Sequence, residues 1–171
     1  MQANTTIALA GNPNVGKSTI FNALTGVRQH VGNWPGKTVE KKEGRFSVDG
    51  RDYTVVDLPG TYSLTAYSVE EIIARDFIVN ENPGTVVAVV DASNLERNLY
   101  LISQALELNR PLVIALNRVD VAAENGVELK TDLIARRLGV PVIATQAHRR
   151  IGLDDLRQAL LGAVGSTPVA A

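Results

Sequence analysis

The sequence contains no cysteine, which excludes a disulfide framework and a metal site built from thiolates. It has only two histidines, His30 and His148, and they lie far apart in the chain, so a histidine-based transition-metal site is not expected. Long apolar runs are also missing, because residues 85–90 and 111–116 are far shorter than a membrane-spanning helix of about 20 residues. The first residues lack the charged start and apolar stretch of a secretion signal, which favours a soluble, cytoplasmic chain.

Blocks of basic residues are absent as well. The chain has 17 Lys and Arg against 18 Asp and Glu, a formal net charge of −1. Electrostatic recruitment to nucleic acids needs a basic surface, so no nucleic-acid partner is expected. The hydrophobic content of 45% and the length of 171 residues are typical of one globular domain with a proper core. We expect this domain to cover residues 1–165, followed by a linker or tail at residues 166–171.

Apolar and amphipathic segments alternate almost from end to end of the chain. The pattern predicts strands at residues 6–10, 45–48, 53–56, 85–90, 112–116 and 141–145, and helices at residues 18–24, 68–79, 95–108, 128–138 and 153–164. Asp49-Gly50 predicts a hairpin turn, and residues 27–43 are expected to form a long loop. The predicted fold class is α/β, with a six-stranded, mostly parallel sheet, one antiparallel edge strand and helices on both faces. Such sheets bind ligands at the carboxyl ends of their strands.

The segment Gly11–Ser18 reads GNPNVGKS and lies between a predicted strand and a predicted helix. This is the complete G-x-x-x-x-G-K-[ST] pattern of a phosphate-binding loop, whose glycines let backbone N–H groups point at a phosphate chain. Lys17 then reaches the outer phosphates, and Ser18 ligates magnesium. A glycine-rich turn that binds nothing is the alternative, and the order of strand, loop and helix argues against it. Asn14 either offers an oxygen to a monovalent cation or is an ordinary turn residue, and spacing alone leaves both open.

Two further segments suit a nucleoside triphosphate. Asp57-Leu58-Pro59-Gly60 ends the strand predicted at residues 53–56, where Asp57 can hold magnesium through a water and Gly60 can offer its N–H to a terminal phosphate. Alone, the D-x-x-G pattern is also a common turn. Thr38 lies in the predicted long loop, and its hydroxyl would complete the magnesium sphere only when a third phosphate is present, which would make the loop a switch. The alternative for Thr38 is a solvent-facing loop residue.

Asn117-Arg118-Val119-Asp120 follows the strand predicted at residues 112–116. An asparagine amide beside a purine ring, with a carboxylate that accepts two N–H bonds, would select guanine, because adenine would leave buried polar groups unpaired. The aliphatic stem of Arg118 would pack against the base. The alternative is an Asx-type turn that starts the next helix.

The order of these motifs resembles that of the Ras-like and Era-like P-loop GTPases, and the resemblance extends to about residue 164. The segments that carry it are Gly11–Ser18, Thr38, Asp57–Gly60 and Asn117–Asp120. A narrower similarity lies in Val31–Glu40, which reads VGNWPGKTVE, and in Asp57–Leu64, which reads DLPGTYSL. With the phosphate loop, these segments resemble the G domain of the bacterial ferrous-iron transport protein B (FeoB) family.

This resemblance implies a regulatory GTP-binding (G) domain of a bacterial iron(II) membrane transporter, placed at the cytoplasmic face of the inner membrane. Its partners would be the helical and permease domains of the same full-length protein, and a homo-oligomer is left open. Its cofactors would be GTP or GDP, Mg²⁺ and K⁺, with Mg²⁺ on Ser18, Thr38 and Asp57. Asn14 would bind K⁺ together with backbone carbonyls of residues 32–36. Hydrolysis of GTP to GDP and phosphate would be stimulated by potassium but slow, because Thr61 stands where many relatives carry a water-orienting glutamine.

The resemblance also implies the members of the nucleotide site. The catalytic residues would be Lys17, Asn14, Thr38 and Gly60. Arg118 stands where lysine is usual, and a guanine-supporting loop is matched near residues 145–148, with the Ala147 N–H facing the guanine oxygen. The residues expected to contact the nucleotide are Gly11, Asn12, Pro13, Asn14, Val15, Gly16, Lys17, Ser18, Thr19, Gly36, Lys37, Thr38, Val39, Glu40, Asp57, Leu58, Pro59, Gly60, Asn117, Arg118, Asp120, Gln146, Ala147 and His148.

Two other functions stay open at this point. Thr61 in place of glutamine is also compatible with a nucleotide-gated binding module whose hydrolysis is incidental. An Era-like GTPase of ribosome assembly or tRNA modification would bind RNA in a salt-sensitive way, which the near-neutral charge disfavours. An ATPase or kinase is disfavoured by Asn117 and Asp120.

Overall fold

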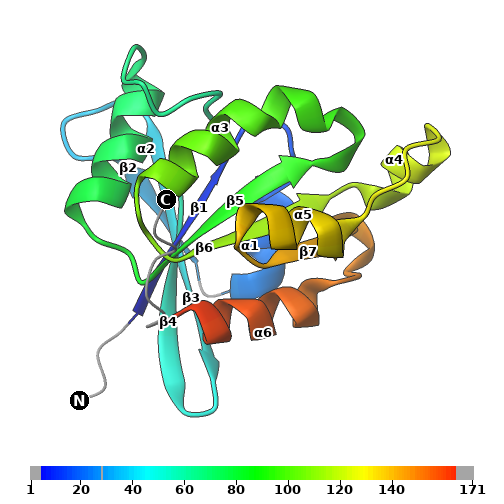
Figure 1. Ribbon diagram of the computed structural model, residues 1–171. Coiled ribbons are helices and arrows are strands. Elements are labelled where there is room, and N and C mark those ends of the chain that lie inside the picture. The colour runs from blue at the N-terminus through cyan, green and yellow to red at the C-terminus, as the bar shows by residue number, and fades with distance from the viewer. Residues whose placement is uncertain (1–4, 28, 165–171) are drawn as a thin grey trace.

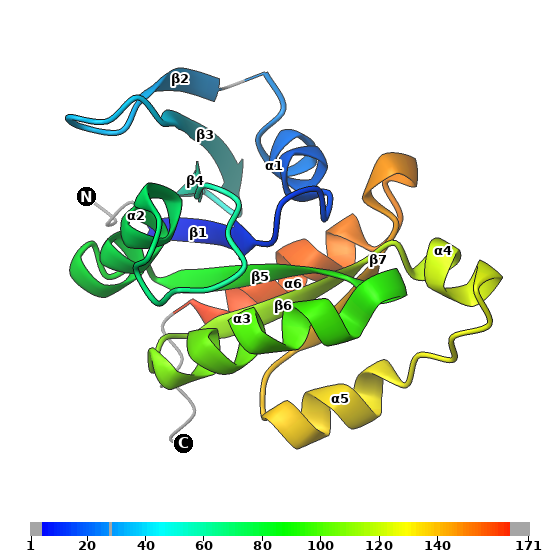
Figure 2. The same cartoon turned by 90° about the horizontal axis from the view of Figure 1, so that it is seen from above.

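The computed structural model describes residues 5–27 and 29–164, which form one sheet with helices on both faces (Figure 1; Figure 2). The tail expected at residues 166–171 lies outside the described residues. The strands are β1 (Thr5–Gly11), β2 (Gln29–Asn33), β3 (Glu40–Val48), β4 (Arg51–Asp57), β5 (Thr85–Asp91), β6 (Leu112–Asn117) and β7 (Val142–Thr145). The helices are α1 (Lys17–Thr25), α2 (Val69–Asn80), α3 (Leu95–Glu107), α4 (Val119–Glu124), α5 (Thr131–Leu138) and α6 (Leu153–Ala163), with short 3₁₀ turns at Ala92–Asn94 and Ala147–Arg149.

The strands lie side by side in the order β2-β3-β4-β1-β5-β6-β7. Strands β4, β1, β5, β6 and β7 are parallel, whereas β3 is antiparallel to both of its neighbours. The α/β class, the mostly parallel sheet and the helices on both faces are therefore confirmed. The predicted number of six strands is wrong, because the described residues form seven, and the edge is β2 rather than β3.

The prediction of a long loop at residues 27–43 is wrong for most of these residues. β2 and the start of β3 lie within it, so that only residues 34–39 connect two strands. No pattern in the sequence predicts β2, because none of its side chains is fully buried and polar residues dominate it. Its pairing with β3, from Gln29 opposite Gly44 to Asn33 opposite Glu40, supplies the hydrogen bonds instead. The turn at Asp49 and Gly50 matches expectation, with positive φ angles of 50° and 71°.

Alternate residues of the central strands enter two hydrophobic cores on opposite faces of the sheet. Ile7 of β1 packs with Phe21 of α1 and Leu156 of α6. Its neighbour Ala8 faces the other core, which contains Ile73 of α2. Central strands that are buried on both sides read as continuous apolar runs, as β5 does. Polar side chains are therefore concentrated where these strands end.

Helix boundaries follow local signals where such signals exist. Ser68 caps α2: its hydroxyl accepts the Glu71 N–H at 3.1 Å, and the Glu71 carboxylate accepts the Ser68 N–H at 3.3 Å. The helix predicted at residues 128–138 begins only at Thr131, and α4 precedes it as a separate short helix. The two helices are separated by residues 125–130, so the positions from Val119 to Leu138 do not form one continuous segment.

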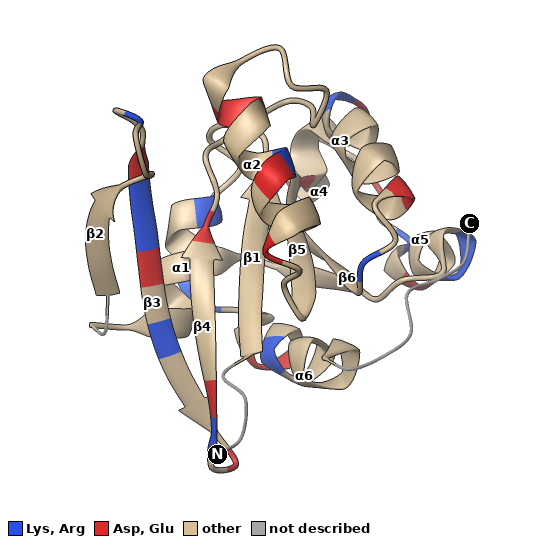
Figure 3. Ribbon diagram, turned by 90° about the vertical axis from the view of Figure 1, so that its left-hand side faces the viewer, with Lys and Arg blue, Asp and Glu red and all other residues tan. Residues whose placement is uncertain are grey.

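The strand next to the edge of the sheet, β3, carries charges of both signs. Two lysines stand between two glutamates on it (Figure 3), where Lys41 pairs with Glu43 at 3.2 Å and Lys42 pairs with Glu40 at 3.0 Å. Charges near an exposed edge strand discourage pairing with another chain. None of the described helices has both the length and the apolar content needed to cross a bilayer.

Candidate functional site

A cavity of about 480 Å³ opens where the central strands end. The segment after β1, the residue Gly60 after β4 and the residue Arg118 after β6 all line it, so the topology brings three of the predicted motifs to one edge of the sheet. The lining residues are Asn12, Pro13, Asn14, Gly16, Lys17, Ser18, Thr19, Gly60 and Arg118.

The backbone of the predicted phosphate loop turns sharply between β1 and α1. Asn14 and Gly16 have φ angles of 63° and 94°, in the left-handed region that glycine adopts most easily. A side chain at Gly16 would also force its surroundings to shift, because a Cβ there would lie 2.2 Å from Nδ2 of Asn117. α1 begins directly afterwards at Lys17 and carries no acidic residue in its first turn. Its positive N-terminal end therefore faces the cavity with no acidic residue of its own first turn beside it.

Lys17 and Asp57 form an ion pair between Nζ and Oδ1. The exposed fractions of the two side chains are only 11% and 7%. Each of these little-exposed charges is thus paired with an opposite charge, as buried charges in proteins generally are. The residues expected to hold a phosphate and a metal are thus next to each other at the cavity.

Gly60 packs against the phosphate loop, since a Cβ at this position would lie 3.2 Å from Cα of Pro13. The next residue, Thr61, donates its N–H to the Gly11 carbonyl at 3.1 Å and its hydroxyl to the Ser63 carbonyl at 2.6 Å. The Leu58 side chain is fully buried in a core cluster and does not line the cavity, contrary to its place in the expected contact set. It directly follows β4, and its N–H is bonded to the Leu9 carbonyl of β1 at 3.0 Å.

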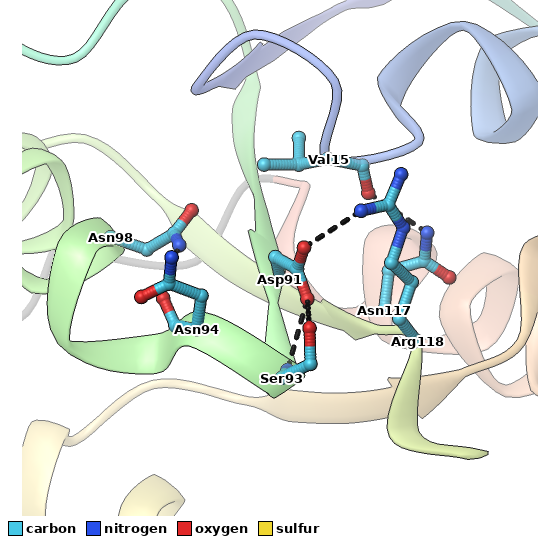
Figure 4. Close-up of polar contacts among 7 residues, drawn as sticks. All are labelled: Val15, Asp91, Ser93, Asn94, Asn98, Asn117 and Arg118. Carbon is cyan, nitrogen blue, oxygen red and sulfur yellow. Dashed lines mark hydrogen bonds and ion pairs between the residues drawn. The ribbon is translucent and has the colours of Figure 1, made fainter. Parts of the chain in front are cut away.

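Asn117 is a buried junction between three segments, with 4% of its surface exposed. Its Nδ2 donates to the Val15 carbonyl at 2.9 Å (Figure 4). Its Oδ1 accepts from the Ala147 N–H at 3.0 Å and from the Thr145 hydroxyl at 3.1 Å. The Ala147 N–H, expected to face a guanine oxygen, is therefore bonded to Asn117 in this structure. Asn117 ties the phosphate loop to the loop after β7.

Buried acceptors without a partner lie beside this junction. Oδ1 of Asp120 and Oε1 of Gln146 have no hydrogen bond within the described part of the chain. The other oxygen of Asp120 lies 3.5 Å from Nε2 of His148, a side chain that is 55% exposed. Buried acceptors of this kind are rare unless a ligand or water supplies the donor. A third residue, Asn12, has the same feature at the phosphate end: its Oδ1 has no partner among the described residues, and its Nδ2 is bonded to the Arg97 carbonyl at 3.2 Å.

Arg118 has a fixed backbone and a fixed partner. Its φ of 62° is left-handed, and its Nη1 donates to Oδ2 of Asp91 at 2.8 Å. Asp91 also accepts the N–H and the hydroxyl of Ser93 on its other oxygen, at 2.9 and 2.6 Å. Sequence analysis did not select Asp91, although it directly follows the strand predicted at residues 85–90 and so lies at the ligand-binding edge. Nothing in the sequence around Ser93 or Thr145 indicates their contacts at this site in a comparable way.

The structure does not bring the segment Gly36–Glu40, including Thr38, Lys37 and Val39, to the cavity. Thr38 is exposed, and the preceding Trp34 is buried edge-on against Phe77 of α2, with ring centroids 5.6 Å apart. Lys37 lines a different cavity of about 350 Å³ between this segment and α2. The apolar contact of Trp34 thus keeps the expected switch away from the phosphate loop in this arrangement.

A mostly parallel sheet with a strand–GNPNVGKS–helix unit, an aspartate at the end of β4 and the asparagine–aspartate motif after β6 defines the P-loop GTPase fold. The comparisons with known proteins narrow this class. Residues 5–160 match the family described as "Ferrous iron transport protein B". The chain belongs to this family, and its solved relatives identify it with the G domain.

Similarity to individual relatives is high. The chain is 50% identical over 159 residues to the Fe(2+) transporter FeoB of Shigella flexneri, a match that covers 91% of the chain and 21% of the relative. The chain therefore spans about a fifth of the length of the curated relatives it matches. The FeoB G domain of Methanococcus jannaschii superposes with a TM-score of 0.85 at 48% identity, covering 96% of this chain and 100% of that one. The cytosolic domain of Thermotoga maritima FeoB in its GMPPNP form gives 0.93 at 40% identity, covering 98% and 66%.

Proposed function

We propose that the chain binds GTP and GDP and hydrolyses GTP slowly, as the regulatory G domain of an iron(II) transporter. The observation that carries this proposal is one edge of the sheet where two features meet: a phosphate loop that leads into a helix without acidic residues in its first turn, and a buried carboxylate oxygen with no partner within the described residues. The first feature attracts a phosphate chain, and the second requires an N–H donor. A guanine nucleotide carries both groups.

The phosphate end would be held by backbone N–H groups of residues 14–18 and by Lys17. In the structure Lys17 is paired with Asp57, so a phosphate would replace Asp57 as the partner of the ammonium group. Gly60, packed against Pro13, would present its N–H to the last phosphate. Each of these groups already lies at the cavity or borders it.

The base end would be read by Asp120. Guanine offers two adjacent N–H donors. One oxygen of Asp120 is buried without a donor among the described residues, and the other lies 3.5 Å from Nε2 of the exposed His148 side chain. Adenine has no matching donor pair and would leave the carboxylate unpaired, a strong penalty in a buried site. Gln146 supplies a further unpartnered oxygen beside it.

The residues present fit a bound Mg²⁺. Within the described residues no group of three or more His, Cys, Asp or Glu side chains is placed to hold a metal. Mg²⁺ needs no such group, since it keeps several waters and takes one or two protein oxygens together with substrate phosphates. Ser18 and Asp57 would supply these oxygens, and Thr38 would add its hydroxyl once residues 34–39 leave α2. The ion would supply positive charge next to the phosphates between which the bond breaks.

A potassium ion would be held by Asn14, whose exposed side chain lines the same cavity. The carbonyls of residues 32–36 would complete its ligands, which requires the same approach of the segment after β2. Thr61 cannot take the role of a water-orienting glutamine, because its side chain is 3% exposed and its hydroxyl is bonded to Ser63. Slow hydrolysis that depends on the cation follows from these two features.

The relatives support the wider setting. Structures of the Thermotoga maritima FeoB cytosolic domain are described in GMPPNP and GDP forms, and that protein is called an iron transporter. We infer that residues 1–165 act as one G domain coupled to helical and permease domains of a longer protein, at the cytoplasmic face of the bacterial inner membrane. A second function, a nucleotide-gated binding module with incidental hydrolysis, is favoured by the engaged hydroxyl of Thr61.

Single-turnover GTP hydrolysis in potassium and in sodium tests the proposal. The wild-type chain should bind GTP and hydrolyse it faster in potassium, and Asn14→Ala should remove the difference between the two salts. Asn109→Ala is the matched control, because Asn109 is exposed, has a φ of 56° and lies outside the cavity. Equal and negligible rates in both salts, with GTP bound, would favour the binding module. Absence of GTP and GDP binding by folded protein would reject both functions.

A further inference from the structure

Asp91 is the last residue of β5 and lies directly beside Asn117 of β6 in the sheet. Only 13% of its side chain is exposed, and three hydrogen bonds fix its carboxylate. Two of them come from Ser93, in the turn that leads to α3, and the third comes from Arg118 (Figure 4). This turn is itself held, since Nδ2 of the buried Asn98 donates to the Asn94 carbonyl at 2.7 Å.

Arg118 lines the nucleotide cavity, and 40% of its side chain is exposed. An arginine in this position has many rotamers of similar energy unless a partner selects one. The left-handed backbone at φ 62° fixes the direction of its Cβ, and the bond from Nη1 to Asp91 fixes the far end. The aliphatic stem between these two points therefore has a defined position at the cavity.

We propose that Asp91 is a positioning residue of the nucleotide site, which holds the stem of Arg118 in place as a wall of the purine pocket. Asp91 does not line the cavity itself and acts only through Arg118. The inference rests on the proposed binding of a guanine nucleotide. It also explains an arginine at this position, because the guanidinium can bind the carboxylate of Asp91 while its stem stays beside the base.

Dissociation of a fluorescent GDP analogue from the full chain, followed by stopped flow, tests this role. Asp91→Asn and Arg118→Met should each raise the dissociation rate about three- to tenfold, the range expected for one charge-assisted bond that is partly exposed to water. The double variant should be no faster than the faster single variant, because both changes remove the same contact that fixes the stem at position 118. Asp154→Asn is the matched control, since it breaks an Asp–Arg pair of 3.0 Å on α6 and should leave the rate unchanged.

A second readout separates positioning from general damage. The ratio of GDP to inosine diphosphate affinity reports the contact of Asp120 with the 2-amino group, which Arg118 does not make. Asp91→Asn should therefore leave this ratio within twofold of wild type, whereas Asp120→Asn should change it at least tenfold. Ser93→Ala removes one of the three hydrogen bonds to the Asp91 carboxylate without removing its charge. It should raise the GDP dissociation rate in the same direction, so it carries the test if Asp91→Asn does not fold.

Each remaining outcome overturns the inference. A wild-type dissociation rate in Asp91→Asn would do so, as would rate increases of Asp91→Asn and Arg118→Met that multiply in the double variant. A wild-type chain that binds no GDP would instead reject the proposed function. Binding by wild type together with an unaffected Asp91→Asn would reject the positioning role alone.

Discussion

Asn117 offers a test in which structure and nucleotide binding can be separated. Its side chain makes three hydrogen bonds inside the protein, to the Val15 carbonyl, the Ala147 N–H and the Thr145 hydroxyl. Asn117→Ala removes this partner from all three groups and leaves the Thr145 hydroxyl only its longer bond of 3.5 Å to the Leu116 carbonyl. At about 1 kcal/mol for each lost bond, the free energy of unfolding should fall by roughly 3 kcal/mol. For a domain of this size that corresponds to a melting temperature about 6–12 °C lower.

The assay is urea unfolding of protein stripped of nucleotide, so that loss of ligand binding cannot contribute. Asn98→Ala is the matched control, because Asn98 is equally buried at 3% exposure but makes one side-chain hydrogen bond. Its Oδ1 has no partner within the described residues, so its removal should lower stability by about 1 kcal/mol or less. If the two variants lost the same stability, or Asn117→Ala lost less than the control, the structural role assigned to Asn117 would be refuted.

Three further predictions follow from single contacts. The pKa of Glu71 is lowered, first by the hydrogen bond from the Ser63 hydroxyl, so its contribution to stability is present above the unfolded pKa near 4.5 and is lost as the pH falls through the lower folded value. The difference in melting temperature between wild type and Glu71→Gln should therefore stay constant above about pH 5 and shrink below pH 4.5, measured by circular dichroism. Gly16→Ala should abolish nucleotide binding in calorimetry, because its Cβ would lie 2.2 Å from Nδ2 of Asn117 and force the loop to move. Trp34 is the only tryptophan, so its fluorescence should differ between the GDP-bound and GTP-analogue-bound chain, and identical spectra and quenching would contradict the switch assigned to residues 34–39.

Motifs formed by residues that are close together in the sequence were predictable. The segment Gly11–Ser18 lies where its strand and helix neighbours place it, and the capping box of Ser68 and Glu71 is present as the spacing indicates. The parallel core was predictable because strands buried on both faces must be continuously apolar. These features depend on few neighbours, so a single sequence contains enough information to identify them.

Features that depend on distant partners were not predictable. β2 forms because its backbone pairs with that of β3. The side chains of β2 show no pattern of burial that would indicate a strand. The positioning role proposed for Asp91 depends on its hydrogen bond with Arg118, which is 27 residues away in the sequence. The Asn117 junction depends in the same way on Val15, which is 102 residues away. The position of Thr38 depends on where Trp34 packs, and nothing in the local sequence indicates Phe77 as its partner.

These contacts divide the site into two parts with different attachments. At the base end, the phosphate loop and the loop after β7 are joined through Asn117, with no contribution from α2. On the other side, α2 contacts both the segment expected to act as a switch and the segment after Gly60: Phe77 packs against Trp34, and Glu71 accepts the Ser63 hydroxyl at 2.7 Å. A ligand that draws residues 34–39 toward its last phosphate must therefore separate Trp34 from α2, the helix whose first turn holds the segment after Gly60. Recognition of the base can stay constant while this second part responds, which is the arrangement that a nucleotide-dependent regulatory domain requires.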